Sequence, residues 1–347
     1  MDKKQKAFDS ELCHDLLVKN VKPKYSYKEG LDFNKWRETI KEKFIESLGI
    51  DVIKENDCPL NFDIEWEEDR GTYRMIRFTI DSEIGETIPC YLLIPKLNKK
   101  KYPVAITMQG HSTGFHISIG ETKYEHDEDF LPRGAFALQA VNNGYVALAI
   151  EQRGMGERRA HTDNRSNDIN CRWPYRVALM LGRTLVGERI WDIGKCIDAL
   201  SNFPECDMDK IFITGNSGGG TISYYSACLD DRIKFSAPSC AVCPYADSIL
   251  ALAHCGCNYL PNAYRNFEMQ DLACLIAPKN LVIFAGQLDD IFPIEGTRRG
   301  FETIKKIYRE IGAEDKCRLV ETPREHWWCE DIIWTEINKE CEKLGWR

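Results

Sequence analysis

Short apolar runs recur along this 347-residue chain, separated by longer stretches that often have the spacing of helices. The runs are Val104–Met108, Tyr145–Ile150, Ile211–Thr214, Phe235–Ser239, Leu281–Ala285 and Arg318–Val320. Runs that are apolar throughout are typical of buried parallel strands, because helices cover both faces of such a sheet. The alternation therefore predicts an α/β fold with a mostly parallel central sheet and helices on both faces.

The chain before these runs has a different pattern. Residues Tyr73–Ile80 and Thr87–Ile94 flank a polar turn and predict two antiparallel strands. Residues before about 60 show amphipathic helical patterns, as in Phe33–Leu48, without a catalytic motif. We therefore predict an N-terminal helical extension over residues 1–65. A single catalytic domain follows over residues 66–347, with loop insertions near 152–183 and 244–271.

The most informative motif follows the run at Ile211. It is Gly215-Asn216-Ser217-Gly218-Gly219, a G-x-S-x-G sequence directly after an apolar strand. Small residues at both ends of such a motif allow a tight strand-to-helix turn, which exposes the serine hydroxyl to substrate. The pattern predicts a nucleophile elbow with Ser217 as the nucleophile.

Two later apolar runs deliver an acid and a histidine. Asp289 and Asp290 follow the run at Leu281, and His326 follows the run at Arg318. The order serine, acid, histidine is the one that α/β-hydrolases use, with spacings of 289 − 217 = 72 and 326 − 289 = 37 residues. We predict a triad of Ser217, Asp289 and His326, with Asp290 as the rival for the role of the acid.

The loop after Val104–Met108 contains Gly110-His111-Ser112 and stands where such enzymes build half of the oxyanion hole. Two backbone N–H groups must point at the developing oxyanion, and we predict those of His111 and Gly218. A glycine turn with a surface histidine is the alternative for this loop. Arg153, after the run at Tyr145, is interpreted as bracing loops rather than binding substrate.

Charge and composition limit the partners. The net charge of −8 offers no basic stripe for nucleic acid, and the amino terminus lacks the apolar stretch of a secretion signal. No run approaches membrane-spanning length. We expect a cytoplasmic protein that acts on a small-molecule or carbohydrate ester, binds neither nucleic acid nor membranes and needs no cofactor. The sequence leaves homo-oligomerisation open.

Cysteine is abundant, with fifteen residues scattered along the chain. An odd number without a framework of spacings fits a reducing compartment, where most cysteines act as small buried hydrophobic residues. Cys240, Cys243, Cys255 and Cys257 could together supply zinc ligands, but the second pair is Cys-x-Cys within an apolar stretch. We therefore favour core packing over a metal and expect no metal site.

Segments upstream of the serine carry a resemblance to a known family. They are Gly182–Gly187, Trp191-Asp192, Cys196–Leu200 and Asp207–Ile211. Over roughly residues 70–340 the chain resembles the α/β-hydrolases around acetyl xylan esterase, cephalosporin C deacetylase and the dienelactone-hydrolase-like esterases. This resemblance implies an α/β-hydrolase fold and a triad whose acid lies in Gly-x-x-Asp, with a proline four residues later.

Gly286, Asp289 and Pro293 match that acid motif. Two positions depart from it, because the xylan esterases usually have glutamine beside the nucleophile and tyrosine in the oxyanion loop. This chain has Gly218 and His111 there. The resemblance therefore implies hydrolase chemistry without fixing the acyl group.

Three functions remain after this reading. The first is a serine carboxylic-ester hydrolase that removes acetyl or other short acyl groups from a carbohydrate or small metabolite through an acyl-serine intermediate. The second is a serine peptidase of the prolyl-oligopeptidase type, which the lack of room for a propeller disfavours. The third is a non-catalytic binding protein on the same scaffold, which the intact triad disfavours.

Overall fold

The computed structural model describes residues 10–160 and 171–347. The strands are β1 (Asp63–Asp69), β2 (Tyr73–Glu83), β3 (Glu86–Pro95), β4 (Tyr102–Met108), β5 (Val146–Ile150), β6 (Cys206–Asn216), β7 (Ile233–Ser239), β8 (Asn280–Gly286) and β9 (Cys317–Thr322). The helices are α1 (Ser10–Asn20), α2 (Phe33–Leu48), α3 (Ile50–Lys54), α4 (Phe136–Asn142), α5 (Arg172–Met180), α6 (Leu185–Leu200), α7 (Gly218–Leu229), α8 (Ala263–Asn266), α9 (Ala273–Ile276), α10 (Ile294–Glu310) and α11 (Glu330–Lys343). None of the described helices is long and apolar enough to cross a membrane.

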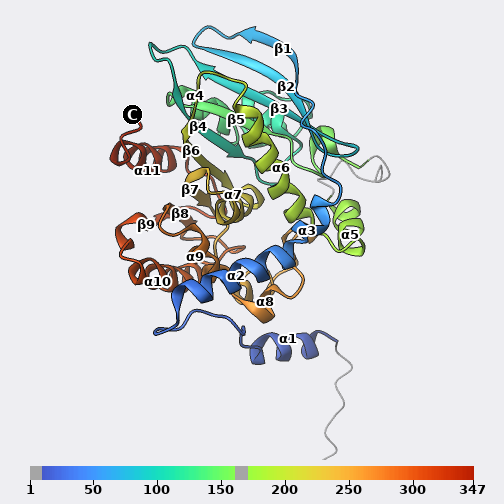
Figure 1. Ribbon diagram of the computed structural model, residues 1–347, viewed down its shortest axis with the longest axis vertical. Helices are drawn as coiled ribbons and strands as arrows, with labels where there is room; N and C mark the ends of the chain where they lie inside the picture. The colour runs from blue at the N-terminus through green and yellow to red at the C-terminus, as the bar shows by residue number, and fades with distance from the viewer. Residues whose placement is uncertain (1–9, 161–170) are drawn as a thin grey trace, which may run out of the picture.

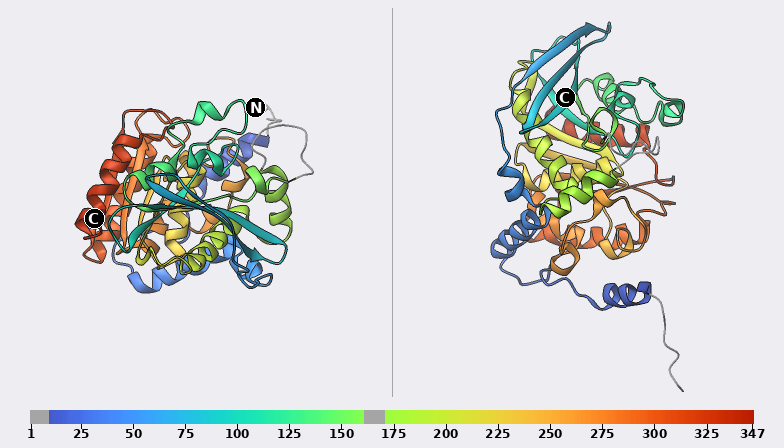
Figure 2. Two further views of the ribbon diagram at one scale, coloured as in Figure 1. Left: turned by 90° about the horizontal axis from the view of Figure 1, so that it is seen from above. Right: turned by 90° about the vertical axis from the view of Figure 1, so that its right-hand side faces the viewer.

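All strands of the described chain join one sheet in the order β1-β2-β3-β5-β4-β6-β7-β8-β9. The strands from β5 to β9 pair in parallel, whereas β1, β2 and β3 add an antiparallel edge. The sheet forms the centre of the molecule, and its antiparallel end projects beyond the helices (Figures 1 and 2). This topology confirms the predicted α/β fold with a mostly parallel sheet.

Alternation along the central strands divides the core into two layers. Ile211 and Ile213 of β6 face one cluster of buried side chains, to which α2, α6, α7 and α10 contribute. Phe212, between them, faces the other cluster, under α4 and α11. Successive side chains of a strand point to opposite faces, so a run that is apolar at every position requires helices on both sides. The sheet is therefore held rigidly between two helical layers.

The N-terminal segment belongs to this core. Trp36, Ile40 and Phe44 recur every four residues along α2, and all three are buried in the same cluster as the central strands. Asp32 caps the start of α2 by accepting from the N–H of Lys35, at 3.2 Å. The helices predicted within residues 1–65 are present, but α2 and α3 pack on helices of the catalytic domain, α3 against α6 and α2 against α6, α8 and α9, whereas α1 lies away from the body (Figure 1).

Two segments differ from the sequence pattern in detail. Strand β1 was not predicted, because its residues are mostly charged and exposed along the whole strand. The predicted insertion at 152–183 contains α5, while residues 161–170 lie outside the described chain. The predicted insertion at 244–271 consists of short turns and α8. The second insertion lines the cavity that contains Ser217, and Cys171 of the first lies beside His111, which lines the same cavity.

Candidate active site

Ser217 lies at the sharp turn between the end of β6 and the start of α7. Its backbone has φ 56° and ψ −124°, a conformation that residues with a side chain rarely adopt. Its N–H donates to the carbonyl of Ser239 at the end of β7, at 2.9 Å. The parallel sheet therefore holds a strained turn that presents the serine at the carboxyl ends of the strands, where sites of α/β proteins form.

Glycine is required on both sides of this turn. A Cβ atom at Gly215 would overlap the carbonyl oxygen of Met108, and one at Gly219 would overlap the carbonyl oxygens of Met108 and Gln109. Backbone carbonyls cannot move aside without displacing β4 and the loop that follows it. The G-x-S-x-G pattern thus reflects close packing of the turn against the neighbouring strand.

The predicted acid and histidine meet across the ends of β8 and β9. Nδ1 of His326 lies 2.9 Å from Oδ2 of Asp289, and the Asp289 side chain is fully buried. The other carboxylate oxygen, Oδ1, accepts from the N–H groups of Ile291 and Phe292, both at 2.9 Å. Asp290 is exposed. The geometry therefore selects Asp289, rather than Asp290, as the partner of the histidine.

Backbone contacts fix the two loops that carry this pair. The N–H of Leu288 donates to the carbonyl of Arg324 at 3.0 Å, and a Cβ atom at Gly286 would overlap the carbonyl of Glu325. The ring of Phe292 stacks on that of His326, with centroids 5.8 Å apart. The imidazole is therefore held through Nδ1, while its buried Nε2 has no hydrogen-bond partner in the described structure.

Ser217 and His326 line the same cavity, whose volume is about 450 Å³. Its other walls are largely apolar and include Ile117, Phe130, Phe136, Leu252, Phe292 and Trp328. No aspartate or glutamate lines the cavity among the described residues, whereas Arg133 does. A largely apolar cavity of this size with a few converging polar groups is suited to a small organic molecule.

The loop predicted to supply the oxyanion hole does border this cavity. Gly110 and His111 line it beside Ser217, and a Cβ atom at Gly110 would lie 3.3 Å from that of the serine. Gly218 begins α7, so its N–H has no acceptor within the helix. The imidazole of His111 packs over Gly218, where an added Cβ would lie 3.2 Å from Nδ1. A glycine beside the nucleophile therefore makes room for this ring.

A buried carboxyl group braces the same loop from behind. The Glu151 side chain, after β5, accepts from the N–H of Phe115 at 3.2 Å and from Nε2 of Gln109 at 3.3 Å. Burial raises the pKa of Glu151 to about 7, although bonds from the N–H groups of Glu157 and Phe115 lower it. The sequence interpretation did not single out this residue, because a lone glutamate after a strand resembles an ordinary surface residue.

Arg153 lies inside the protein, as a bracing residue would. Its guanidinium group contacts Oε1 of Glu83 at 2.6 Å and Oδ1 of Asp192 at 2.7 Å. Arg158 also contacts Asp192, at 2.8 Å. Arg153 does not line the cavity that contains Ser217. These ion pairs join β2 and α6 to the loop after β5.

The four cysteines considered as zinc ligands do not lie together. Cys240 lies beside Asp289 and His326, and burial together with the Asp289 carboxylate raises the pKa of its thiol to about 12. Sγ of Cys243 is close to the carbonyl of Pro293. Cys255 and Cys257 instead lie with His111 and Cys171. The grouping weighed from the sequence is therefore wrong, and the structure forms a different one.

The mostly parallel sheet carries a serine at a strand–helix turn and an acid–histidine pair after later strands. This arrangement is that of the α/β-hydrolases. Residues 4–235 match the model of the abhydrolase family, and the chain belongs to that family. The matched region includes Ser217 and ends before Asp289. The family match and the fold therefore both confirm the predicted α/β-hydrolase class.

Individual proteins are similar over much of the chain. A protein of Bacillus subtilis (strain 168) named "Putative hydrolase YtaP" is 26% identical over 250 residues, which is 71% of this chain and 80% of that protein. The structure of a "putative acetyl xylan esterase" from Bacteroides fragilis NCTC 9343 has a TM-score of 0.80 at 17% identity, covering 99% of this chain and 97% of the other. A glucuronoyl esterase from Teredinibacter turnerae T7901 has a TM-score of 0.65 at 15% identity, covering 99% and 94%. These structures share the fold.

Proposed function

We propose that this protein is a serine carboxylic-ester hydrolase that removes acetyl or other short acyl groups from a carbohydrate or small metabolite. The observation that carries the proposal is the placement of Ser217, on a strained turn, in the same cavity as the His326–Asp289 pair. The similarity to an acetyl xylan esterase and a glucuronoyl esterase supports ester chemistry.

Each group has a role that its position suits. Nε2 of His326 takes the proton from Ser217 as Oγ attacks the ester carbonyl, and Asp289 holds the imidazole in the tautomer that keeps Nε2 unprotonated. The N–H groups of His111 and Gly218 stabilise the oxyanion. The histidine then returns its proton to the leaving alcohol, and water hydrolyses the acyl-serine by the same steps. The buried Cys240 thiol, with its raised pKa, stays protonated and does not compete as nucleophile.

Ester turnover by the purified protein tests the proposal. We expect p-nitrophenyl acetate to be hydrolysed faster than longer esters, and an aminoacyl-proline p-nitroanilide to be left intact. Cleavage of the anilide with little ester turnover would favour the peptidase. No turnover of any ester, with a folded protein, would favour a binding protein.

Replacement of the nucleophile assigns the activity to this site. Ser217→Ala should lower kcat by several orders of magnitude, because the triad works as a unit. Ser226→Ala is the matched control, since Ser226 is buried in the same helix, its Oγ has no hydrogen-bond partner among the described residues, and it lies outside the cavity. A serine-directed phosphonate should label the wild type and Ser226→Ala but not Ser217→Ala. Equal turnover by the two variants would refute the assignment.

Arg133 favours a second candidate substrate, an ester of an acidic sugar. Arg133 lines the cavity, its guanidinium carbon lies 3.4 Å from the ring centroid of Trp327, and it forms no salt bridge with a carboxylate of the described chain. Such a cation suits an anionic group of the substrate. We expect Arg133→Gln to reduce kcat/KM for an anionic ester much more than for p-nitrophenyl acetate. An equal reduction for both would remove the support for this candidate.

A further inference from the structure

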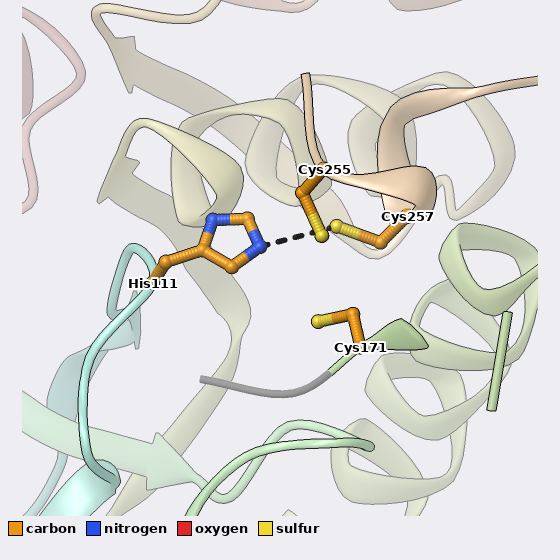
Figure 3. Close-up of side chains that lie close together, drawn as sticks. All are labelled: His111, Cys171, Cys255 and Cys257. Atoms are coloured by element: carbon orange, nitrogen blue, oxygen red, sulfur yellow. Dashed lines mark hydrogen bonds between the residues drawn. The ribbon is translucent and has the colours of Figure 1, made fainter. Parts of the chain in front are cut away.

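Three cysteines and a histidine converge beside the candidate active site. They are His111, Cys171, Cys255 and Cys257, and one ligand atom of each lies within 4.8 Å of those of the others. Nε2 of His111 lies 3.3 Å from Sγ of Cys257, and the cysteine side chains project toward the imidazole from two other segments (Figure 3). We propose that these four residues bind one structural zinc ion.

The distances fit tetrahedral coordination after small side-chain movements. Zinc–sulfur bonds of about 2.3 Å and zinc–nitrogen bonds of about 2.0 Å place the ligand atoms of a tetrahedron roughly 3.5–3.8 Å apart. The separations in the cluster have this scale. Three thiolates and one imidazole form a ligand set that prefers zinc to calcium or magnesium, and four protein ligands leave no open position for catalysis. The site is therefore suited to a structural metal.

A buried arginine supplies an independent observation. Arg189 is 2% exposed, and its Nη2 lies 3.2 Å from Sγ of Cys171. Its other hydrogen bonds go to the carbonyl of Arg153, and Arg189 forms no salt bridge with a carboxylate of the described residues. A buried cation requires a nearby negative charge. A zinc ion with three thiolates and a neutral imidazole carries one net negative charge, which this guanidinium group balances.

Local packing explains how two cysteines separated by a single residue can both reach the cluster. Gly256 separates the two ligands, and a Cβ atom there would overlap the ring of Tyr175. Tyr175 belongs to α5, and Cys171 immediately precedes that helix. The glycine therefore allows the loop to lie against α5, which brings both of its sulfur atoms to the sulfur of Cys171.

The proposed ion would tie together three segments that are distant in the sequence. These are the loop after β4, the residue before α5 and the loop at 255–257. His111 and Cys255 also line the cavity that contains Ser217. Coordination through Nε2 would leave the proton on Nδ1 and hold the ring over Gly218. The metal would thus stabilise the oxyanion loop without contacting the substrate. This reverses the expectation from the sequence that the protein has no metal.

Metal analysis of the protein purified with a thiol reductant tests the proposal without any substrate, so its result is independent of ester turnover. We expect close to one zinc per chain in the wild type and almost none in Cys171→Ser or Cys257→Ser. Cys243→Ser is the matched control, because Cys243 is equally buried and lies outside the cluster; it should keep its zinc. Cys171→His, which retains a ligand, should recover part of the content.

Two measurements on the wild type remain informative if the variants fail to fold. Removal of the metal with a chelator should lower Tm, and readdition of zinc should restore it, because metal-binding energy contributes to folding. Replacement by Co²⁺ should give the visible spectrum of a tetrahedral thiolate site. A wild type without zinc, equal zinc in Cys257→Ser, an unchanged Tm after metal removal, or a disulfide between Cys171 and either loop cysteine in the reduced preparation would overturn the proposal.

Discussion

The buried Glu151 should make stability depend on pH in a direction opposite to that of most carboxyl groups. Burial raises its pKa from 4.5 to about 7 in the folded protein. Between these two values the folded state binds more protons than the unfolded state, so the free energy of unfolding falls as pH rises. At about 1.4 kcal/mol per pH unit, the full effect is about 3 kcal/mol, gained at low pH and lost by about pH 8.

The surroundings of Glu151 support this sign. Nη1 of Arg158 donates to the backbone carbonyl of Glu151 at 2.9 Å and lowers the pKa, whereas the nearby Glu157 carboxylate raises it. His116 and Glu151 both approach Gly114, and burial lowers the pKa of His116. None of these contacts places a salt bridge on the Glu151 carboxyl group, so desolvation dominates.

The assay compares wild type with Glu151→Gln by urea unfolding between pH 4 and pH 8, followed by tryptophan fluorescence. Loss of the N–H contact from Glu157 will destabilise the variant at all pH values, so the slope is the readout rather than the absolute stability. Glu268 and Asp271, whose pKa values burial raises to about 7 and about 6, affect both proteins alike. We expect wild type to lose about 3 kcal/mol more than the variant across this range. Parallel pH profiles would refute the reasoning.

Two further predictions concern the active-site turns. Asp289→Asn should lower kcat by about 10⁴-fold, because the amide misorients the imidazole, whereas Asp290→Asn should have little effect. Steady-state kinetics on variants whose folding is checked by circular dichroism test this, and the reverse order of effects would show that the acid is misassigned. Gly219→Ala should cost roughly 1–3 kcal/mol of stability, because its Cβ would overlap the Met108 carbonyl. Gly194→Ala, in the interior of α6, would place its Cβ at an ordinary contact distance of 3.9 Å from Nη2 of Arg232, and it should be neutral or stabilising by about 1 kcal/mol. Equal changes in the midpoint of unfolding would contradict the packing argument.

The sequence by itself determined the parallel part of the sheet, the elbow and the three residues of the candidate triad. Buried parallel strands have an apolar signature that lies within five or six consecutive residues, and the turn at Ser217 requires glycines only two positions away. Parallel strands also end at the same edge of the sheet. Residues that follow different strands, such as Asp289 and His326, therefore meet although 37 positions separate them.

Only the tertiary structure decided the features that depend on how loops pack. Asp289 rather than Asp290 is the acid, because the Asp289 carboxylate accepts the N–H groups of Ile291 and Phe292 in the next turn. The burial of α2 against α6, α8 and α9 follows from long-range contacts that its amphipathic pattern does not specify.

The cluster of His111 with Cys171, Cys255 and Cys257 shows the same limit most clearly. Its ligands come from three loops, and the sequence offered Cys240 and Cys243 as nearer partners for the Cys-x-Cys pair. Periodicity of apolar residues indicates which face of a helix or strand is buried, because the pattern depends only on residues near one another in the sequence. It does not record which loops meet, because their meeting is set by the packing of the elements that carry them.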